Sequence, residues 1–453
     1  MTKTRLLNNN PPVKAVKEIL QQFGLSPKSF CLAPYLHLDY DQSGEMHSCF
    51  EGKVKMGNWR TGSVFEQFNN KEYQNLRQAH RIGDTISTER NCELCYQHED
   101  HNVLSHRLKT LVDKYNELGH ERFAQLIERL SNIEVDAVNP ANLDHVEIRL
   151  SNFCNLRCLH CDHRSSTQWL NFFTDQERLD AAKNVGVPIH PDANAQNIMK
   201  FFSDHQHSTA KHFDEIVHTL QNSKLITFSG GEPLLDPYYK PLMDELIKHE
   251  YVSSKQLDIH TNLNIKNIEN YFDHWNKFGK TSLYVSIDCP PSTYKYFRRN
   301  GDWQLVYDNI MKIKKEFYQN QKVIIIGHIT FGLFGALRYK EIADTWAQMQ
   351  LQPNSNLITE GPTSARYLTD SLKEKVIQEM QEVILNEQKK YSNEFLKLTE
   401  NCLIYLQNTE RYGEKMNWEV IEWCKLQDKT DDLQTLDFYP ELEMYYNINR
   451  YDK

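Results

Sequence analysis

The sequence lacks the features typical of membrane, secreted and nucleic-acid-binding proteins. Its 52 Lys and Arg residues are outnumbered by 61 Asp and Glu residues, giving a formal net charge of −9 and no overall basic character for binding nucleic acid. No apolar run approaches the length of a membrane span. The N-terminal residues have no apolar core of the signal-peptide kind. We therefore expect a cytoplasmic protein with no membrane or nucleic-acid partner.

The ten cysteines do not form the pattern of a disulfide framework, which is typical of small secreted chains, whereas this chain has 453 residues. Most of them fall into metal-ligand spacings, which need a reducing compartment to persist. Cys289, Cys402 and Cys424 lie outside those spacings and are expected in the core, since free cysteine is among the most buried residue types. Cys289 also follows Asp288 at a predicted strand end, so a substrate-side role is a second interpretation.

Three cysteines are spaced Cys154-x-x-x-Cys158-x-x-Cys161 directly after the apolar run 146–150. Three thiolates in one tight loop can bind three irons of a [4Fe-4S] cube and leave the fourth iron without a protein ligand. An open coordination position is the mark of a catalytic metal site rather than a structural one. The alternative is a Cys3His zinc site completed by His160 or His163.

A second motif lies about seventy residues further on, where an apolar run at 225–228 leads into Ser229-Gly-Gly-Glu-Pro233. Paired glycines let a ligand approach the backbone closely. With the three cysteines upstream, the chain resembles the radical S-adenosylmethionine (SAM) superfamily. The resemblance implies that Cys154, Cys158 and Cys161 ligate the cluster and that SAM chelates the fourth iron. It also implies that the loop contacts the methionyl amine, through Ser229, Gly230, Gly231, Glu232 and Pro233.

The resemblance implies the chemistry as well. A reduced cluster passes one electron to SAM, which cleaves to methionine and a 5′-deoxyadenosyl radical that takes a hydrogen atom from substrate. A flavodoxin- or ferredoxin-like electron donor and a peptide or protein side chain as substrate are implied. The alternatives are a small metabolite, sugar or nucleotide as substrate, and a non-catalytic iron-sulfur or zinc binding protein.

Apolar runs alternating with helical segments predict an α/β fold with parallel strands. By resemblance it is a partial (β/α)6 barrel with reactive groups at the C-terminal ends of its strands. The strands are expected at 145–150, 224–229, 256–261, 281–287, 322–330 and 356–361.

Polar residues at these strand ends are the remaining SAM contacts that the resemblance implies: Thr261, Asn262, Ser286, Asp288 and Arg298, with Arg299 as the neighbouring candidate. His160 stands where the family usually has an aromatic residue and is expected to stack on adenine. The alternatives are a capping role for Asn262 and Asp288, a solvated face for the arginines and a partly exposed loop position for His160.

Four more cysteines precede this region: Cys31, Cys49, Cys92 and Cys95. The Cys92-Glu-Leu-Cys95 pair is expected in a small loop that aims both thiolates at one point, and four thiolates suit zinc or an iron-sulfur cluster. Their order, with a Gly-Asn pair and a helix at 64–68 between them, resembles the Twitch or SPASM domain. That resemblance implies an auxiliary [4Fe-4S] cluster, here placed before the barrel.

The expected organisation has five parts: an extension with a short helix (1–27), the Twitch/SPASM-like module (28–100), a helical linker (101–143), the partial barrel (144–365) and a helical cap with an acidic tail (366–453). An insert at 162–220 is longer than one helix requires. It is either a wall of the substrate site or a variable surface loop.

Overall fold

The computed structural model describes residues 10–446 except for 42, 50–51, 53, 60, 101–103, 141–142, 188–193, 198–212, 222, 249, 386–389, 413–416 and 430–431. The chain divides into two compact units. The first contains residues 1–149, 208–228 and 244–256, and the second contains 150–207, 229–243 and 257–453. The central part of the predicted insert at 162–220, residues 188–193 and 198–212, lies outside the described residues.

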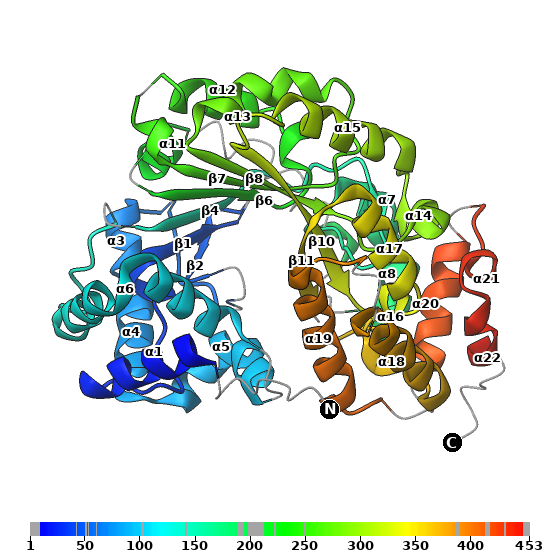
Figure 1. The fold of residues 1–453 in the computed structure, drawn as a ribbon, viewed down its shortest axis with the longest axis horizontal. Coiled ribbons are helices and arrows are strands. Elements are labelled where there is room, and N and C mark those ends of the chain that lie inside the picture. Colours follow the sequence, from blue (N-terminus) through cyan, green and yellow to red (C-terminus); the bar gives the residue numbers. More distant parts are fainter. Residues whose placement is uncertain are drawn as a thin grey trace. The chain divides into compact units, whose positions relative to one another are not determined.

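The first unit contains a sheet with the strand order β6-β4-β1-β2-β3. Figure 1 labels its strands β6, β4, β1 and β2. β1 runs parallel to β4 and antiparallel to β2, and β2 is antiparallel to β3. The strands are β1 (His37–Tyr40), β2 (Glu45–His47), β3 (Gly57–Asn58), β4 (His145–Arg149) and β6 (Leu225–Ser229). The helices are α1 (Pro11–Gln22), α2 (Ala33–Leu36), α3 (Val64–Phe68), α4 (Lys71–Ile82), α5 (Thr85–Asp100), α6 (His106–Asn132) and α11 (Phe213–Gln221), with the 3-10 helix η5 (Glu250–Ser254).

Local sequence explains several of these boundaries. α1 starts with two prolines, which suit the first turn because its N–H groups have no intrahelical partner, and it buries one face against α6. α3 begins with a capping box in which Ser63 and Glu66 each bond the other's backbone N–H. The short helix predicted within 1–27 is α1, the helix predicted at 64–68 is α3, and the predicted helical linker at 101–143 contains α6.

The second unit contains the strand order β11-β10-β8-β7, in which β10 runs parallel to both β8 and β11. These strands are β7 (Gln256–Thr261), β8 (Lys280–Ser286), β10 (Val323–Phe331) and β11 (Gln352–Leu357), and a separate ribbon pairs β5 (Arg157–Cys158) with β9 (Arg298–Arg299). Its helices include α7 (Leu170–Phe173), α8 (Gln176–Asn184), α12 (Tyr239–Leu246), α13 (Phe272–Lys277), α14 (Pro291–Phe297), α15 (Trp303–Glu316), α16 (Leu333–Ala336) and α17 (Tyr339–Met349). Short 3-10 helices are η3 (Thr167–Trp169), η4 (Pro233–Leu235), η6 (Ile268–Tyr271), η7 (Ala365–Tyr367) and η9 (Pro440–Leu442).

Five of the six predicted strands lie within one residue of their expected bounds, and the sixth is misplaced. β11 is Gln352–Leu357 rather than 356–361. The prediction followed an apolar run, whereas β11 lies at the sheet edge and is polar and half exposed, with Pro353 inside it. Edge strands tolerate proline and need no continuous apolar signal, because backbone pairing with β10 defines them.

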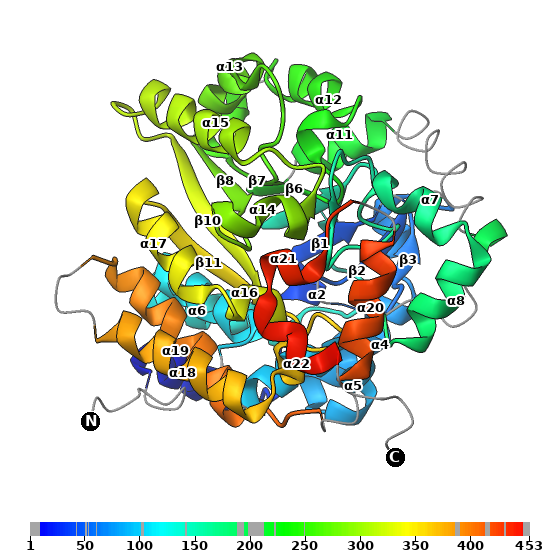
Figure 2. The same ribbon diagram turned by 90° about the vertical axis from the view of Figure 1, so that its right-hand side faces the viewer.

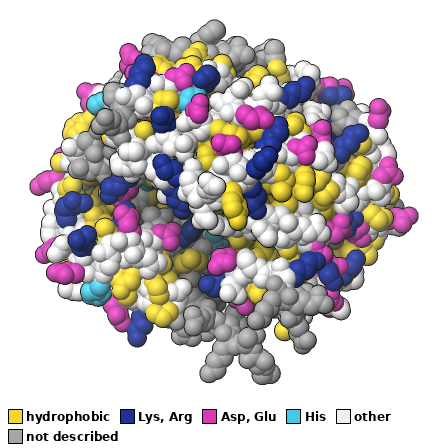
Figure 3. Space-filling view, turned by 45° about the horizontal axis from the view of Figure 1, so that its top comes forward, with side chains coloured by type: hydrophobic (Ala, Val, Ile, Leu, Met, Phe, Trp, Pro, Cys, Tyr) yellow, Lys and Arg dark blue, Asp and Glu magenta, His cyan; other side chains and the backbone are white. Residues whose placement is uncertain are grey.

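The C-terminal region is helical, as predicted: α18 (Asp370–Ile384), α19 (Asn393–Asn408), α20 (Trp418–Asp428), α21 (Thr435–Phe438) and α22 (Glu443–Tyr446). α18 packs on α17 and α19, and α20 contacts both α21 and α22 (Figure 2). Trp423 of α20 joins the aromatic residues after the cysteine loop, stacking on Trp169 with ring centroids 5.8 Å apart. On the face shown in Figure 3, Lys and Arg side chains are interspersed with Asp and Glu side chains.

Candidate active site

The three closely spaced cysteines lie together in the second unit. Cys154 and Cys158 are buried, Cys161 is half-buried, and all three pack with Leu156 as free thiols. Cys158 belongs to β5, whose pairing with β9 fixes the middle of the loop. The structure therefore brings the predicted cluster ligands to one place.

The surroundings of these thiols fit an iron-sulfur cluster. The Leu156 N–H and the Asn262 amide donate to the Cys154 sulfur at 3.4 and 3.7 Å, and N–H donors to sulfur are a common support of such clusters. Burial, followed by the nearby Cys158 sulfur, raises the pKa of Cys154 to about 12. A bound cation would lower this pKa again, because metal ligation requires the thiol to be deprotonated to a thiolate.

The Gly-Gly-Glu-Pro loop packs directly against the start of the cysteine loop. The Gly231 N–H donates to the Ser151 carbonyl at 3.2 Å, and the Glu232 N–H donates to the Phe153 carbonyl at 2.7 Å. A Cβ on Gly231 would lie 2.4 Å from the Phe153 carbonyl oxygen, so only glycine fits there. Gly230 has φ +105°, which glycine adopts without a steric penalty. Ser229 and Gly230 are half-buried, and Pro233 begins η4.

Glu232 connects this loop to the end of β7. Its carboxylate accepts hydrogen bonds from the Thr261 hydroxyl at 2.8 Å, the Asn262 N–H at 2.6 Å and the Leu234 N–H at 3.2 Å. The carboxylate is 1% exposed, and this burial raises its pKa to about 7. Both oxygens already have protein donors, so a direct contact between Glu232 and SAM stays a prediction.

Asn262 caps a turn, as one alternative expected, and also lies beside the cysteine loop. Its side-chain oxygen accepts from the Asn264 N–H at 2.7 Å, which is a turn-capping contact. Its side-chain amide donates to Asn155 at 3.0 Å and faces the Cys154 sulfur. Thr261 and Asn262 therefore lie beside the cysteine loop.

Asp288 and Arg298 form a buried ion pair. Arg298 donates through Nε at 3.0 Å and through a terminal nitrogen to one Asp288 oxygen, and the Thr330 N–H donates to the other at 2.7 Å. Burial alone would raise the pKa of Asp288, but the Arg298 guanidinium, His160 and the Thr330 N–H together hold that pKa below its ordinary value. Arg298 also lies opposite Cys158 in the β5–β9 ribbon.

The structure separates the two neighbouring arginines. Arg299 turns away and donates to the Gln427 carbonyl at 2.7 Å. Both arginines are buried, so the alternative of a solvated face is wrong. Only Arg298 lies at the candidate site.

His160 is held between Phe297 and Asp288. Its ring stacks on Phe297 with centroids 5.2 Å apart, and its Nε2 lies 4.0 Å from an Asp288 oxygen. Its side chain is 13% exposed and lies in a turn, which agrees with the alternative of a partly exposed loop position. Burial lowers its pKa, which favours a neutral, flat ring. Stacking of this ring on adenine stays a prediction.

Sequence reasoning missed a group of rings on one face of the second unit's sheet. His260 of β7 stacks on Tyr284 of β8 at 4.7 Å and meets His328 of β10 edge-on at 5.7 Å. Asn354 of β11 lies 3.0 Å from the His328 ring nitrogen. Ser286, two residues after Tyr284, is half-buried and in register with His328. Alternation of polar and apolar residues along β7 and β8 was the available signal.

Comparison with known proteins agrees with these motifs. Residues 148–332 match the family model described as Radical SAM superfamily, and this span includes the three cysteines and the Gly-Gly-Glu-Pro loop. The chain contains a radical SAM domain. That domain marks the protein as a radical SAM enzyme, and it implies a [4Fe-4S] cluster and SAM as cofactors, together with a substrate and an electron donor. The mostly parallel α/β architecture fits this family.

No curated protein shows significant similarity to the chain. Within the described part of the chain, no helix is long and apolar enough to cross a membrane.

The other four cysteines line one pocket in the first unit. Cys31 precedes α2, Cys49 follows β2, and Cys92 and Cys95 lie on α5. The expected small loop around Cys92 and Cys95 is wrong, because this segment is helical; residues three apart on a helix still share a face. The pocket is also lined by His80 and Arg107.

Proposed function

We propose that this radical SAM enzyme holds an auxiliary [4Fe-4S] cluster in the first unit and abstracts a hydrogen atom from a peptide or protein side chain. The observation that carries the proposal is the pocket shared by Cys31, Cys49, Cys92 and Cys95. These residues come from three separate segments, and four converging thiols are a complete ligand set for such a cluster.

The pocket is supported by contacts that keep its shape. The Ala33 N–H donates to the Cys31 sulfur at 3.4 Å, and the His80 ring nitrogen Nε2 lies 3.8 Å from the Cys92 sulfur. Arg107 pairs with Glu99 and donates to the Phe30 carbonyl at 2.8 Å. Because Arg107 belongs to α6, the proposed Twitch/SPASM-like module extends beyond its expected end at residue 100. The proposed barrel begins with β4, and the C-terminal cap with η7.

In the second unit, the proposed roles follow from the contacts of the site. Cys154, Cys158 and Cys161 would hold the reactive cluster, which with bound SAM supplies the radical chemistry. Ser229, Gly230, Gly231, Glu232 and Pro233 would shape the methionyl side of the SAM site. Thr261, Asn262, Ser286, Asp288 and Arg298 would surround the ribose and carboxylate, and His160 would contact adenine.

A substrate of peptide type is proposed because auxiliary clusters accompany peptide modification in the family that this pocket resembles. Deuterium tracing tests it. The reconstituted enzyme is incubated with SAM and reductant, together with either peptides or small metabolites extracted from deuterated cells. We expect deuterium in 5′-deoxyadenosine from the peptide fraction, because the abstracted atom moves to that product. Deuterium from the small-molecule fraction alone would contradict the substrate class.

The auxiliary cluster has its own test. Iron and sulfide are counted after anaerobic reconstitution of the wild-type chain and of the Cys92→Ser/Cys95→Ser double variant. We expect the double variant to hold about four irons fewer. Equal iron in both proteins, together with zinc in the wild type, would identify the pocket as a structural zinc site instead.

A further inference from the structure

A group of potential metal ligands that contains no cysteine lies on the polar face of the first unit's sheet. His37 of β1 and His145 of β4 stand in register on parallel strands, and Glu147 lies two residues after His145. Residues two apart on a strand share a face, so all three side chains project to the same side. One ligand atom from each lies within 4.8 Å of the others.

The group is buried, and one of its polar atoms lacks a partner. His37 is 5% exposed and Glu147 is 7% exposed. The Nε2 atom of His37 is buried without a hydrogen-bond partner among the described residues. A buried polar atom left unsatisfied costs free energy, so such an atom calls for a ligand.

His145 is oriented from the neighbouring strand. Its Nε2 lies 2.8 Å from the Thr227 hydroxyl of β6. When Nε2 carries the proton and donates to that hydroxyl, Nδ1 has the lone pair needed by a metal. Such outer partners typically fix the ring of a metal-bound histidine.

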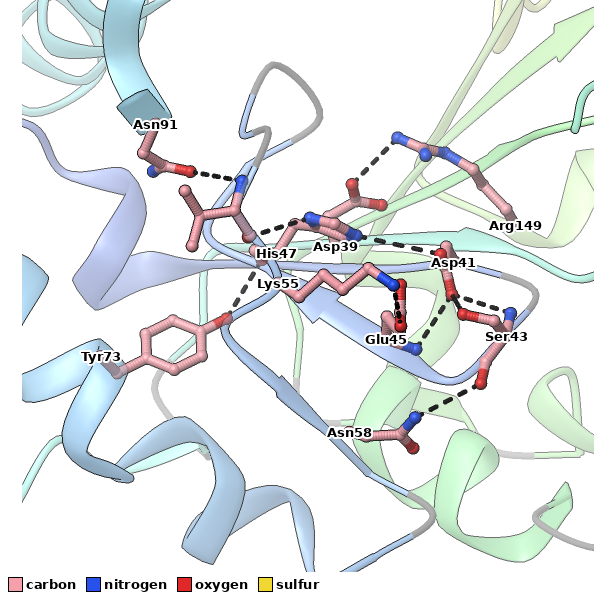
Figure 4. Close-up of polar contacts among 11 residues, drawn as sticks. Asp39, Asp41, Ser43, Glu45, His47, Lys55, Asn58, Tyr73, Asn91 and Arg149 are labelled. Atoms are coloured by element: carbon pink, nitrogen blue, oxygen red, sulfur yellow. Dashed lines mark hydrogen bonds and ion pairs between the residues drawn. The ribbon is translucent and has the colours of Figure 1, made fainter. Parts of the chain in front are cut away.

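The charges on this face favour a cation. Next to Glu147, Asp39 accepts from the Arg149 guanidinium at 2.9 Å (Figure 4). The Arg149 guanidinium interacts electrostatically with Asp39 and with its register partner Glu147. A divalent ion bound between the two imidazoles and Glu147 would be attracted by both carboxylates.

A second group of ligand types, on the β1–β2 hairpin, is already satisfied by internal contacts. Asp41 accepts from the Ser43 N–H at 2.8 Å and the Glu45 N–H at 2.9 Å, and Glu45 pairs with Lys55 at 2.5 Å (Figure 4). His47 lies 3.2 Å from the Val54 carbonyl. These contacts close the turn and explain the group without a metal.

We propose that His37, His145 and Glu147 bind one divalent transition-metal ion. Two imidazoles and one carboxylate are the donor set of many zinc and non-haem iron sites, and three protein ligands leave a coordination position open for a further ligand. The two rings now stack nearly parallel, with centroids 4.1 Å apart and an interplanar angle of 11°. Ligation requires the His37 ring to turn about χ2, a torsion with a broad energy well in histidine, while the Thr227 hydroxyl holds the His145 ring.

Zinc binding to the cluster-loaded chain tests the proposal. Equilibrium dialysis against Zn²⁺ is followed by counting of zinc and iron per chain, for the wild type, Glu147→Gln and His37→Asn. His120→Asn, which changes an exposed histidine, is the matched control. We expect the wild type and the control to retain one more zinc than the two ligand variants, with iron unchanged.

The amount of zinc held at cysteines would be the same in all four proteins. The difference in zinc per chain between them therefore reports on the His37, His145 and Glu147 site alone. Equal zinc in all four, or zinc uptake accompanied by iron loss, would overturn the site. Far-UV circular dichroism checks that the variants fold. Glu147→Gln keeps the side-chain shape, so it tests the site even if His37→Asn does not fold. The result is independent of SAM cleavage and of the auxiliary cluster.

Discussion

The two sets of cysteines are held by different kinds of structure. In the second unit, three thiols lie on one short loop, with a glycine loop, an amide and a buried ion pair arranged around them. In the first unit, four thiols come from three segments and line a pocket of their own. Three ligands leave an iron open for chemistry, whereas four ligands close a cluster. In the proposed assignment, ligand number and surroundings, rather than the cysteines alone, separate the reactive cluster site from the auxiliary one.

The largest expected effect comes from removing one ligand at each site. Cys158→Ala should lose about four irons per chain and abolish 5′-deoxyadenosine formation, since the reactive cluster has no spare thiolate. Cys95→Ala should leave the reactive cluster in place. Iron counting and chromatography of the nucleoside measure both effects. Equal loss of iron and of SAM cleavage in the two variants would contradict two independent cluster sites.

The next largest effect is a difference in stability between the buried ion pairs near the two sets of cysteines. Asp288→Asn leaves Arg298 buried without its partner, so the free energy of unfolding should fall by about 3–5 kcal/mol. Glu99→Gln in the Arg107 pair should cost less, because Glu99 is 16% exposed and water can replace part of the interaction. Urea unfolding gives both values. A larger loss of unfolding free energy for Glu99→Gln than for Asp288→Asn would contradict the view that the Asp288–Arg298 pair is the more buried of the two.

A methyl group added beside each set of cysteines gives a matched pair. Gly231→Ala would place a Cβ 2.4 Å from the Phe153 backbone oxygen, whereas at Gly52 the nearest atoms are the Asn91 side-chain oxygen at 3.0 Å and the Cys49 backbone oxygen at 3.1 Å. Overpacking costs about 1–3 kcal/mol, and the shorter contact at Gly231 requires the larger shift. We expect Gly231→Ala to lower the urea midpoint and SAM cleavage more than Gly52→Ala. Similar effects would show that the Gly-Gly loop can move.

The last comparison concerns pH. Burial raises the pKa of Glu232 from 4.5 to about 7, so between these values the folded chain keeps a proton that the unfolded chain has released. The free energy of unfolding should therefore fall as the pH rises from 4.5 to 7, and this slope should be missing in Glu232→Gln. Urea unfolding of both proteins at several pH values gives the difference in their free energies of unfolding, and this difference isolates the contribution of Glu232. A difference that does not vary with pH would place the carboxylate in a more solvated state.

Much of the framework could be predicted from the sequence because its signals are local. The cysteine spacings, the Gly-Gly pair and the apolar strands are each contained in a few neighbouring residues, and five strands were placed correctly on that basis. β11 was misplaced because its pairing with β10, rather than its own composition, makes it a strand.

The remaining features depend on contacts between distant residues. Nothing in the Arg298-Arg299 pair shows that one side chain pairs with Asp288 while the other bonds Gln427. Likewise, His37 and His145 are more than a hundred residues apart and meet only because β1 pairs with β4. The helical setting of Cys92 and Cys95 also followed from packing of α5 on α4, which a two-residue spacing does not encode.

The most direct test of the account is one measurement on the wild-type chain. After anaerobic reconstitution, iron and sulfide are counted, SAM and dithionite are added, and 5′-deoxyadenosine is assayed by chromatography. The account predicts about eight irons per chain together with formation of the nucleoside, as expected for one reactive and one auxiliary [4Fe-4S] cluster. About four irons per chain with the nucleoside still formed would contradict the two-cluster account.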